Sequence, residues 1–271
     1  MGARAPDALA PAPAPEVDAD SSQAYFPMNR FMNNSLSRIY QIQAKRLAPM
    51  RARILRRAGI GRKRRVLDLG CGTGAVTPEL ARRSGGMVAA LDEDINALRS
   101  VPENFRSSHR IRGDARNPPF AEKTFDLVFS QLFFLWTNAE NAAREIFRVL
   151  QPEGILIAFE PDYGGMMEHP EEGGLKDVWN AALRRAGADP IIGRKLPEIL
   201  EKCGFKTRID LLPEISGDYP EKWDIMATLP LNESEKKRAA ERKNLEKESG
   251  KVFRPLVHLP FFIITAQKKL R

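Results

Sequence analysis

The sequence predicts an α/β fold with a Rossmann-like, doubly wound and mostly parallel sheet. Short apolar stretches of strand length alternate with helical patterns along most of the chain, which is typical of a sheet covered by helices on both faces. A glycine-rich turn joins the first predicted strand to the helix that follows it. The chain has 271 residues, of which 42% are hydrophobic, so it can bury the core that such a domain requires.

The predicted elements follow one another in a regular order. Strands are expected at 65–69, 87–91, 109–112, 125–130, 154–159, 205–211 and 257–266. Helices are expected at 77–83, 95–100, 138–150, 175–186 and 196–203. Asn138 suits the N-cap position of the helix at 138–150, whose apolar face carries Ala142, Ile146 and Val149.

The first 60 residues are expected to lie outside the sheet. Residues 1–22 are rich in Ala and Pro, which predicts an extended tail, and 23–60 are expected to form a helical cap. Apolar residues at helical spacing predict helix over 37–58, and Pro49 is expected to break or kink it. Residues 61–271 would then form the main domain. Its charged insertion, at about 217–253, is expected to be a solvated helix or a mobile loop.

The positive formal charge of +8 is concentrated in one segment. All ten charged side chains between Lys45 and Arg65 are basic, so the rest of the chain is slightly acidic. One interpretation is the solvated face of an amphipathic helix, with its arginines in water. The other is a patch that meets the phosphates of a nucleic acid. The segment has no interleaved aromatic side chains to stack on bases, which favours the solvated face.

Composition also excludes some classes of protein. No apolar run approaches the roughly 20 residues that span a bilayer, and the acidic N-terminus does not resemble a signal or transit peptide. Cys71 and Cys203 are the two cysteines, and the chain has three histidines. These counts argue against a disulfide framework and a structural zinc site. We therefore expect a cytoplasmic protein with no membrane partner and no metal.

The glycine-rich turn has the chemistry of a cofactor loop. It runs from Val66 to Gly74 with the sequence VLDLGCGTG, and its glycines let a ligand approach the backbone closely. Asp92, at the end of the second predicted strand, is placed to bind ribose hydroxyls. The pattern Gly70, Gly72 and Ala75 also fits a dinucleotide-binding loop. At this point a nicotinamide-dependent oxidoreductase remains an alternative.

Four segments together resemble the class I S-adenosylmethionine-dependent methyltransferases, especially those that methylate small molecules. They are VLDLGCGTG at 66–74, LDEDINAL at 91–98, GDARNPPFAEKTFDLV at 113–128 and REIFRVLQPEGILIAFEP at 144–161. The resemblance covers about residues 60–212. It implies a seven-stranded sheet whose last strand is antiparallel, with S-adenosylmethionine as the cofactor.

The resemblance also implies roles for individual residues. Asp68 would order the loop, while Gly70, Cys71, Gly72 and Gly74 would lie against the methionine part of the cofactor. Asp92 would hold the ribose. Asp114 would accept the adenine amine, with the Ala115 backbone beside it. Ser130 and Gln131 would end the fourth strand, where cofactor and acceptor meet. Glu93 stands beside Asp92 where the family often has an apolar residue, which is a departure from its pattern.

The acceptor side is expected beyond the fourth and fifth strands. Asp162, Tyr163 and His169 are candidate catalytic bases, because ligands bind at the carboxyl ends of strands in such folds. Glu160 stands in the same stretch, and turn formation is the alternative explanation for the group. The predicted acceptor-binding side chains are Tyr25, Phe26, Phe134, Trp136 and Tyr163. In many relatives N-terminal helices cover this side, so Tyr25 and Phe26 are expected to belong to a lid.

These observations leave four hypotheses. The first is methyl transfer to a small molecule on oxygen, nitrogen or carbon. The second is methylation of RNA or protein recruited by residues 45–65. The third is the oxidoreductase, disfavoured because no site for hydride transfer is evident downstream of the loop. The fourth is a protein that binds the cofactor without turnover.

Overall fold

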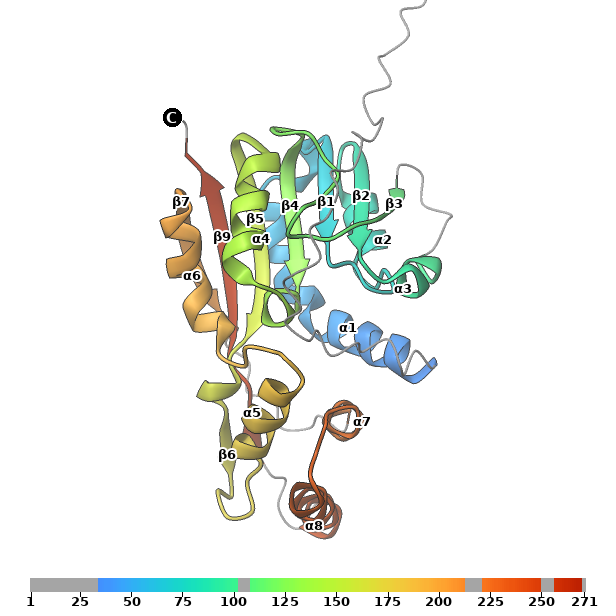
Figure 1. Cartoon of the computed structure of the whole chain (residues 1–271), viewed down its shortest axis with the longest axis vertical. Helices are drawn as coiled ribbons and strands as arrows, with labels where there is room; N and C mark the ends of the chain where they lie inside the picture. The colour runs from blue at the N-terminus through green and yellow to red at the C-terminus, as the bar shows by residue number, and fades with distance from the viewer. Residues whose placement is uncertain (1–33, 102–107, 213–220, 250–255, 270–271) are drawn as a thin grey trace, which may run out of the picture.

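The computed structural model describes residues 34–101, 108–212, 221–249 and 256–269. A seven-stranded sheet with the order β3-β2-β1-β4-β5-β9-β7 forms its centre (Figure 1). The strands are β1 (Arg65–Leu69), β2 (Met87–Asp92), β3 (Ser108–Arg112), β4 (Phe125–Gln131), β5 (Leu150–Pro161), β7 (Phe205–Leu211) and β9 (Phe261–Lys268). Strands β1 to β5 pair in parallel, and β9 pairs antiparallel with β5 and β7. The predicted fold class is therefore confirmed.

Helices cover both faces of this sheet. They include α2 (Thr77–Arg83), α3 (Ile95–Arg99), α4 (Ala139–Val149) and α6 (Ile192–Lys202), whereas α5 (Lys176–Arg185) lies apart from the sheet faces (Figure 1). Side chains alternate along each strand, so neighbouring residues enter different cores. On β1, Val66 packs in the core that contains α2, and Leu67 in the core that contains α4 and α6.

The first described helix, α1 (Asn34–Arg57), passes through Pro49 without a break. Of the break or kink predicted at Pro49, the break is therefore absent. Leu47 and Ile54 lie on either side of the proline, and both are buried in the same core. The burial of these two side chains outweighs the loss of the one backbone hydrogen bond that the proline cannot donate. A short 3-10 helix, η2 (Ile60–Arg62), then leads into β1.

The predicted last strand is divided in two. Residues of β8 (Leu256–His258) pair with β6 (Met167–His169) in a separate two-stranded sheet, and β9 begins only at Phe261. Pro260 stands between the two strands and has no N–H group for a ladder bond. The chain therefore changes sheets at this point.

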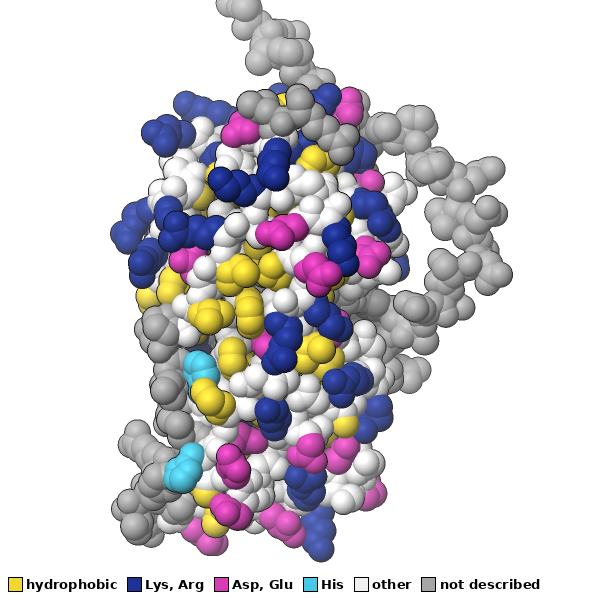
Figure 2. All heavy atoms as spheres, turned by 90° about the vertical axis from the view of Figure 1, so that its left-hand side faces the viewer, with side chains coloured by type: hydrophobic (Ala, Val, Ile, Leu, Met, Phe, Trp, Pro, Cys, Tyr) yellow, Lys and Arg dark blue, Asp and Glu magenta, His cyan; other side chains and the backbone are white. Residues whose placement is uncertain are grey.

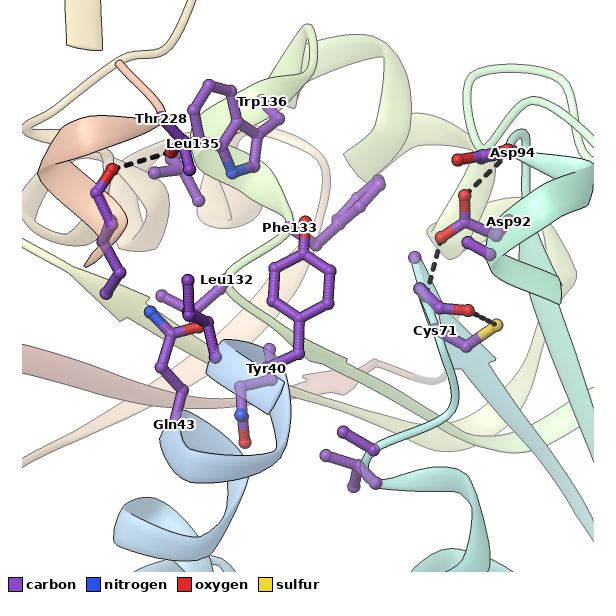
Figure 3. Close-up of a pocket in the computed structure, with 18 of the residues that line it drawn as sticks. Tyr40, Gln43, Cys71, Asp92, Asp94, Leu132, Phe133, Leu135, Trp136 and Thr228 are labelled. Atoms are coloured by element: carbon purple, nitrogen blue, oxygen red, sulfur yellow. Dashed lines mark hydrogen bonds between the residues drawn. The ribbon is translucent and has the colours of Figure 1, made fainter. Parts of the chain in front are cut away.

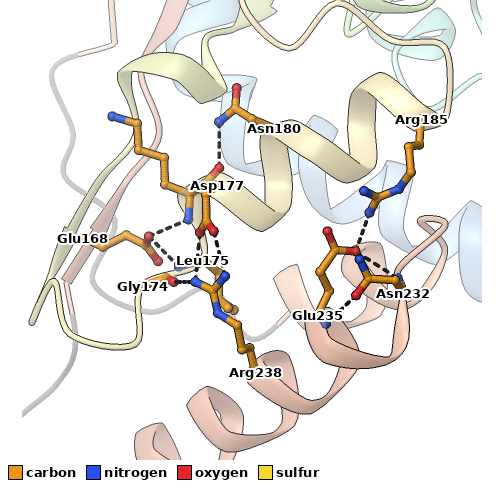
Figure 4. A network of polar contacts seen from close by, with 10 residues as sticks. Glu168, Gly174, Leu175, Asp177, Asn180, Arg185, Asn232, Glu235 and Arg238 are labelled. Atoms are coloured by element: carbon orange, nitrogen blue, oxygen red, sulfur yellow. Dashed lines mark hydrogen bonds and ion pairs between the residues drawn. The ribbon is translucent and has the colours of Figure 1, made fainter.

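The charged insertion folds as two helices, α7 (Lys222–Ala227) and α8 (Glu233–Ser249). They lie with α5 and β6 in a lobe beyond the carboxyl ends of the parallel strands (Figure 1). Ion pairs join α8 to α5: Arg238 pairs with Asp177 at 2.7 Å, and Glu235 pairs with Arg185 (Figure 4). Arg242, also on α8, is buried and donates to the carbonyls of Pro170 and Glu172. Of the two expectations, the solvated helix agrees with the structure, because most side chains of α8 are exposed, while these contacts attach the helix to the lobe.

Strand β7 forms one edge of the large sheet. Ile209 is 47% exposed and Leu211 is 57% exposed on this edge, which faces the viewer in Figure 2. Lys206 and Arg208 alternate with them along the strand. Charged residues on an edge strand oppose pairing with another chain.

The predicted tail at 1–22 lies outside the described residues, as do Tyr25 and Phe26. Of the predicted cap at 23–60, the described part forms α1 and the start of η2. The domain boundaries at 22 and 60 therefore stay predictions.

Candidate active site

A pocket lies at the carboxyl ends of β1, β2 and β4, with α1 on one side and the lobe of α5 and α7 on another (Figure 3). One end is polar and is formed by the glycine-rich loop and the end of β2. The other end is apolar and is formed by the loop after β4 together with residues of α5 and α7. The pocket is continuous between these two ends.

The glycine-rich loop turns sharply between β1 and α2. Gly70 has φ +66° and Gly72 has φ +52°, a region of backbone conformation that favours glycine. A Cβ atom on Gly70 would lie 2.4 Å from the ring of Phe133, so a larger residue would displace that ring. Both glycines line the pocket, which leaves their backbone open to a ligand.

Asp92 ends β2 and faces this loop across the pocket. Its carboxylate accepts hydrogen bonds from the backbone N–H of Gly72 at 2.7 Å and of Asp94 at 3.0 Å (Figure 3). Burial raises the pKa of the Asp92 carboxyl above its ordinary value, and the backbone N–H groups partly oppose the shift. Asp92 thus tightens the loop and lines the pocket at the same time.

Asp68 lies beneath the loop and is 3% exposed. It accepts a hydrogen bond from the Thr77 hydroxyl at 2.6 Å and reaches the pocket wall. Burial raises the pKa of the Asp68 carboxyl to about 6, while the Thr77 bond and the positive charge of Arg51 act in the opposite direction. Asp68 therefore fixes the first turn of α2 relative to β1.

The other predicted cofactor residues divide into two groups. Cys71, Glu93 and Gln131 line the pocket. Outside its wall lie Gly74, Asp114, Ala115 and Ser130. A Cβ atom on Gly74 would meet Val101 at 3.0 Å, Ser130 is fully buried, and Asp114 pairs with Arg116 at 2.7 Å. The roles assigned to all seven residues stay predictions.

The apolar end begins at the loop after β4, which contains the 3-10 helix η3 (Phe134–Trp136). Leu132, Phe133, Leu135 and Trp136 line the pocket, whereas Phe134 is fully buried in the core. Phe134 was predicted to bind the acceptor, but its side chain packs in the core, while Phe133 and Trp136 on either side of it face the pocket.

Glu160 holds this loop in place. Its Oε1 accepts hydrogen bonds from the backbone N–H groups of Phe133 at 3.0 Å and Phe134 at 2.9 Å. The carboxyl is fully buried, and burial raises its pKa to about 8 against the effect of these N–H groups. Oε2 has no hydrogen-bond partner within the described residues. Glu160 supports the pocket wall from behind and is not part of its lining.

The three candidate bases lie in different places. Tyr163 lines the pocket, and its ring stacks on Trp179 with 5.5 Å between ring centroids. Asp162 is buried outside the lining, where it pairs with Arg194 at 2.6 Å and accepts from the N–H of Gly165. His169 lies on β6, paired with β8 at the far side of the lobe. Of the three, only Tyr163 lines the pocket.

Helix α1 supplies pocket residues that the sequence analysis missed. Ile39, Tyr40 and Gln43 line the wall, and Tyr40 rises from α1 between the polar and apolar ends in Figure 3. Carbons of its ring would lie 3.9 Å from a Cβ atom on Gly72. Burial, followed by the charges of Asp92 and Asp94, raises the pKa of Tyr40 to about 12, so its hydroxyl keeps its proton. The signal in the sequence that could have identified these residues was the presence of polar side chains, Tyr40 and Gln43, beside the apolar face of this helix.

Arg51 anchors α1 to the rest of the site. The side chain is 3% exposed, and its guanidinium donates to Glu79 of α2 at 2.6 and 2.8 Å. Its Nη1 also donates to the carbonyl of Ala44 and to Oε1 of Gln131, both at 2.9 Å. The sequence analysis placed Arg51 on a solvated face, and this was wrong. The largely buried carboxylate of Glu79, whose side chain is 12% exposed, provides the partner that makes the burial of Arg51 possible.

A comparison with protein families identifies the domain that forms this site. Residues 67–158 match the family model described as a methyltransferase domain. They include the glycine-rich loop, Asp92 and the end of β4. The chain therefore contains a methyltransferase domain at residues 67–158, as its resemblance to the class I S-adenosylmethionine-dependent methyltransferases implied. The sheet order, with one antiparallel strand near its edge, is the arrangement that the sequence motifs implied.

Similar proteins share part of this methyltransferase domain. The chain is 34% identical over 155 residues to a malonyl-[acyl-carrier protein] O-methyltransferase of Erwinia pyrifoliae, covering 56% of this chain and 55% of that protein. It is 30% identical over 169 residues to the human mitochondrial arginine-hydroxylase NDUFAF5, covering 60% of this chain and 48% of that protein. The chain thus spans about half the length of these relatives. Their names differ in activity, so likeness alone does not fix the reaction.

A similarity in structure extends further along the chain than the family model does. The YcgJ protein of Bacillus subtilis superposes with a TM-score of 0.61 at 15% identity, covering 81% of this chain and 98% of that protein. At this level of identity the match shows the fold alone. The fold shared with that protein therefore includes elements outside residues 67–158.

Proposed function

We propose that the protein transfers the methyl group of S-adenosylmethionine to a small molecule with an apolar body. The observation that carries this proposal is the continuous pocket, with acids and glycines at one end and aromatic and aliphatic side chains at the other. A polar cofactor and an apolar acceptor would occupy adjoining parts of such a pocket.

The polar end fits the cofactor in shape and charge. Gly70 and Gly72 have no Cβ atom, so their backbone is open to the pocket. The methionine part of the cofactor would lie against this backbone. Asp92 would accept hydrogen bonds from the ribose hydroxyls. Glu93 lines the wall nearby, whereas Asp114 would have to share its carboxylate between Arg116 and the adenine amine. Asp92 is therefore the stronger candidate for cofactor recognition.

The reaction demands alignment more than acid or base chemistry. When bound, the cofactor supplies an electrophilic methyl group, so that the acceptor's lone pair forms the new bond while the carbon–sulfur bonding pair stays on sulfur. The protein would hold the acceptor in line and exclude water. Tyr40, Tyr163 and Thr228 are the hydroxyl-bearing side chains among the described residues that line the pocket. A base is needed only if the acceptor must lose a proton.

The lobe favours a small acceptor. Ile225, Thr228 and Leu229 of the α7 region close the apolar end opposite the loop after β4. Part of the basic segment is already engaged within the protein: Arg51 binds Glu79, Arg57 pairs with Asp210, and Lys63 donates to the carbonyl of Asp126. These contacts weaken the alternative in which residues 45–65 recruit RNA or protein.

A location in the cytoplasm stays a prediction. In the part of the chain that the structure describes, no helix is long and apolar enough to cross a membrane. The human relative is named as a mitochondrial protein, so likeness does not decide the compartment.

Calorimetry with S-adenosylhomocysteine and with NADH tests the cofactor. We expect S-adenosylhomocysteine to bind and NADH not to bind. A second measurement follows transfer of radiolabelled methyl from S-adenosylmethionine to a small-molecule extract, with Asp92→Ala protein as the matched control. Binding of NADH alone would favour the oxidoreductase. Binding of S-adenosylhomocysteine without label transfer to any extract would favour a protein that binds the cofactor without turnover.

A further inference from the structure

Gln131 stands at the end of β4 and lines the pocket where its polar and apolar ends meet. Its Oε1 accepts a hydrogen bond from Nη1 of Arg51 at 2.9 Å. Within the described residues, its Nε2 has no hydrogen-bond partner. The side chain thus has one satisfied end and one end that is open to a ligand.

Arg51 determines which end of the amide faces the pocket. A guanidinium group has only donors, so the group that meets it must be the oxygen of Gln131. The guanidinium is fixed in turn by Glu79 and by the carbonyl of Ala44, and it is 3% exposed. A reversed amide would bring its N–H groups against those of Arg51. The clamp therefore leaves the NH₂ group of Gln131 as the part available to the pocket.

We propose that this NH₂ group binds an oxygen of the methyl acceptor, and that the acceptor is an apolar molecule with a carbonyl or carboxyl group beside the methylated atom. This inference rests on the proposed function. Gln131 would orient the acceptor as a binding residue, and Arg51 would act through it as a positioning residue. An acceptor that offers only donors in this place would leave its own N–H groups facing those of Gln131.

The surroundings support a role toward the acceptor. The residue that follows Gln131 is Leu132 of the apolar wall, and Figure 3 shows Tyr40 between Leu132 and Asp92. No lysine, arginine or histidine is among the described residues that line the pocket. An acceptor oxygen would therefore depend on neutral donors, and the bond from Arg51 holds the amide of Gln131 in one orientation.

Binding of three simple probes to protein saturated with S-adenosylhomocysteine tests the proposal. The probes are 2-octanone and octanoate, which carry an oxygen acceptor, and octylamine, which carries only donors at neutral pH. The variant is Gln131→Met, which keeps the length of the side chain and removes the amide. The matched control is Gln267→Met on β9, which removes a surface amide bonded to Glu153 of β5. Gln131→Glu is a second, nearly isosteric variant that replaces the donor with an oxygen.

We expect wild-type protein to bind both oxygen-bearing probes more tightly than octylamine. Gln131→Met should weaken these two by about 10-fold, with octylamine and S-adenosylhomocysteine unchanged. Gln131→Glu should weaken them further and favour octylamine. The proposal is wrong if the wild-type protein does not prefer the oxygen-bearing probes, or if Gln131→Met binds them as Gln267→Met does. A loss of S-adenosylhomocysteine affinity in Gln131→Met would assign the amide to the cofactor, and would also overturn it. Failure of the wild-type protein to bind S-adenosylhomocysteine would instead refute the proposed function.

Discussion

Asp92 combines two tasks that a single carboxylate can perform at the end of a strand. One oxygen accepts from Gly72 at 2.7 Å and the other from Asp94 at 3.0 Å, yet the residue still lines the pocket. Each carboxylate oxygen has room for a second donor. Ribose hydroxyls would add to the existing bonds without replacing them.

Asp92→Ala should therefore lower the affinity for S-adenosylhomocysteine by about 10- to 100-fold, because hydrogen bonds to a charged group are lost. Asp92→Asn keeps an acceptor oxygen without the charge and should lose less. Calorimetry at fixed salt measures both, and circular dichroism verifies folding. Equal affinity in wild type and Asp92→Ala would show that ribose is held elsewhere.

Glu160 is a different kind of residue, because its burial has consequences for stability. Its ordinary pKa of 4.5 is raised to about 8 in the folded protein, mainly by burial. The folded state therefore holds a proton that the unfolded state releases between these values. The stabilising contribution of the proton is fully present below pH 4.5 and is lost as pH rises through about 8.

The variant Glu160→Gln mimics the protonated carboxyl and keeps an oxygen for the N–H groups of Phe133 and Phe134. The free energy of unfolding of wild type relative to this variant should fall as pH rises from 5 to 8, by up to about 1.4 kcal/mol per pH unit. Urea denaturation at several pH values measures the difference. Parallel curves for the two proteins would contradict the raised pKa.

At the scale of elements, α1 belongs to the site as much as the sheet does. Its first half presents Ile39, Tyr40 and Gln43 to the pocket, and its second half is buried against the sheet. Arg51 connects these two halves to α2 and β4. The lobe contributes in a comparable way, since α7 closes the apolar end while α8 holds the lobe through ion pairs with α5.

Arg51→Met should destabilise the protein by about 3 kcal/mol, because it removes one partner of a buried ion pair. The matched control is Arg53→Met, an exposed arginine on the same helix, which should change stability by less than about 0.5 kcal/mol. Urea denaturation of both variants gives the comparison. Equal stability of the two would mean that Arg51 contributes no more than a surface charge.

At the scale of the whole molecule, the basic segment contains two kinds of side chain. Some are paired within the protein, and others are exposed to solvent. Arg53, Arg56 and Arg62 are exposed and lie away from the pocket lining. Exposed charges contribute little to stability. Their effect on activity separates the small-molecule proposal from the nucleic-acid alternative.

Replacement of these three arginines by glutamine should leave methyl transfer and S-adenosylhomocysteine affinity unchanged. Neither the wild-type protein nor the triple variant should bind RNA in a gel-shift assay run at low and moderate salt. If RNA binds the wild-type protein tightly and the triple variant weakly, with a shallower salt dependence, the acceptor is a nucleic acid.

Local pattern was sufficient for much of the fold and for the cofactor end. Alternation of strands and helices predicted the sheet, and the bounds of β1, β7 and α2 agree with the predicted ranges. The glycine-rich loop and Asp92 could be predicted as neighbours because parallel strands end at the same edge. These features depend on residues close in sequence and on a rule of topology.

Only the tertiary structure decided the acceptor side. Whether Phe133 or Phe134 faces the pocket depends on how Glu160, 27 residues from Phe133, holds one turn. Arg51 is buried because it pairs with Glu79 of α2. The sequence of α1 alone does not indicate this partner. Tyr40 and the residues of α7 reach one pocket from opposite parts of the chain. The sequence by itself determined the glycine-rich loop and its neighbour Asp92, because both follow from short local motifs at the ends of adjacent parallel strands. The shape of the acceptor side depended on contacts between distant segments, which set the direction of each side chain.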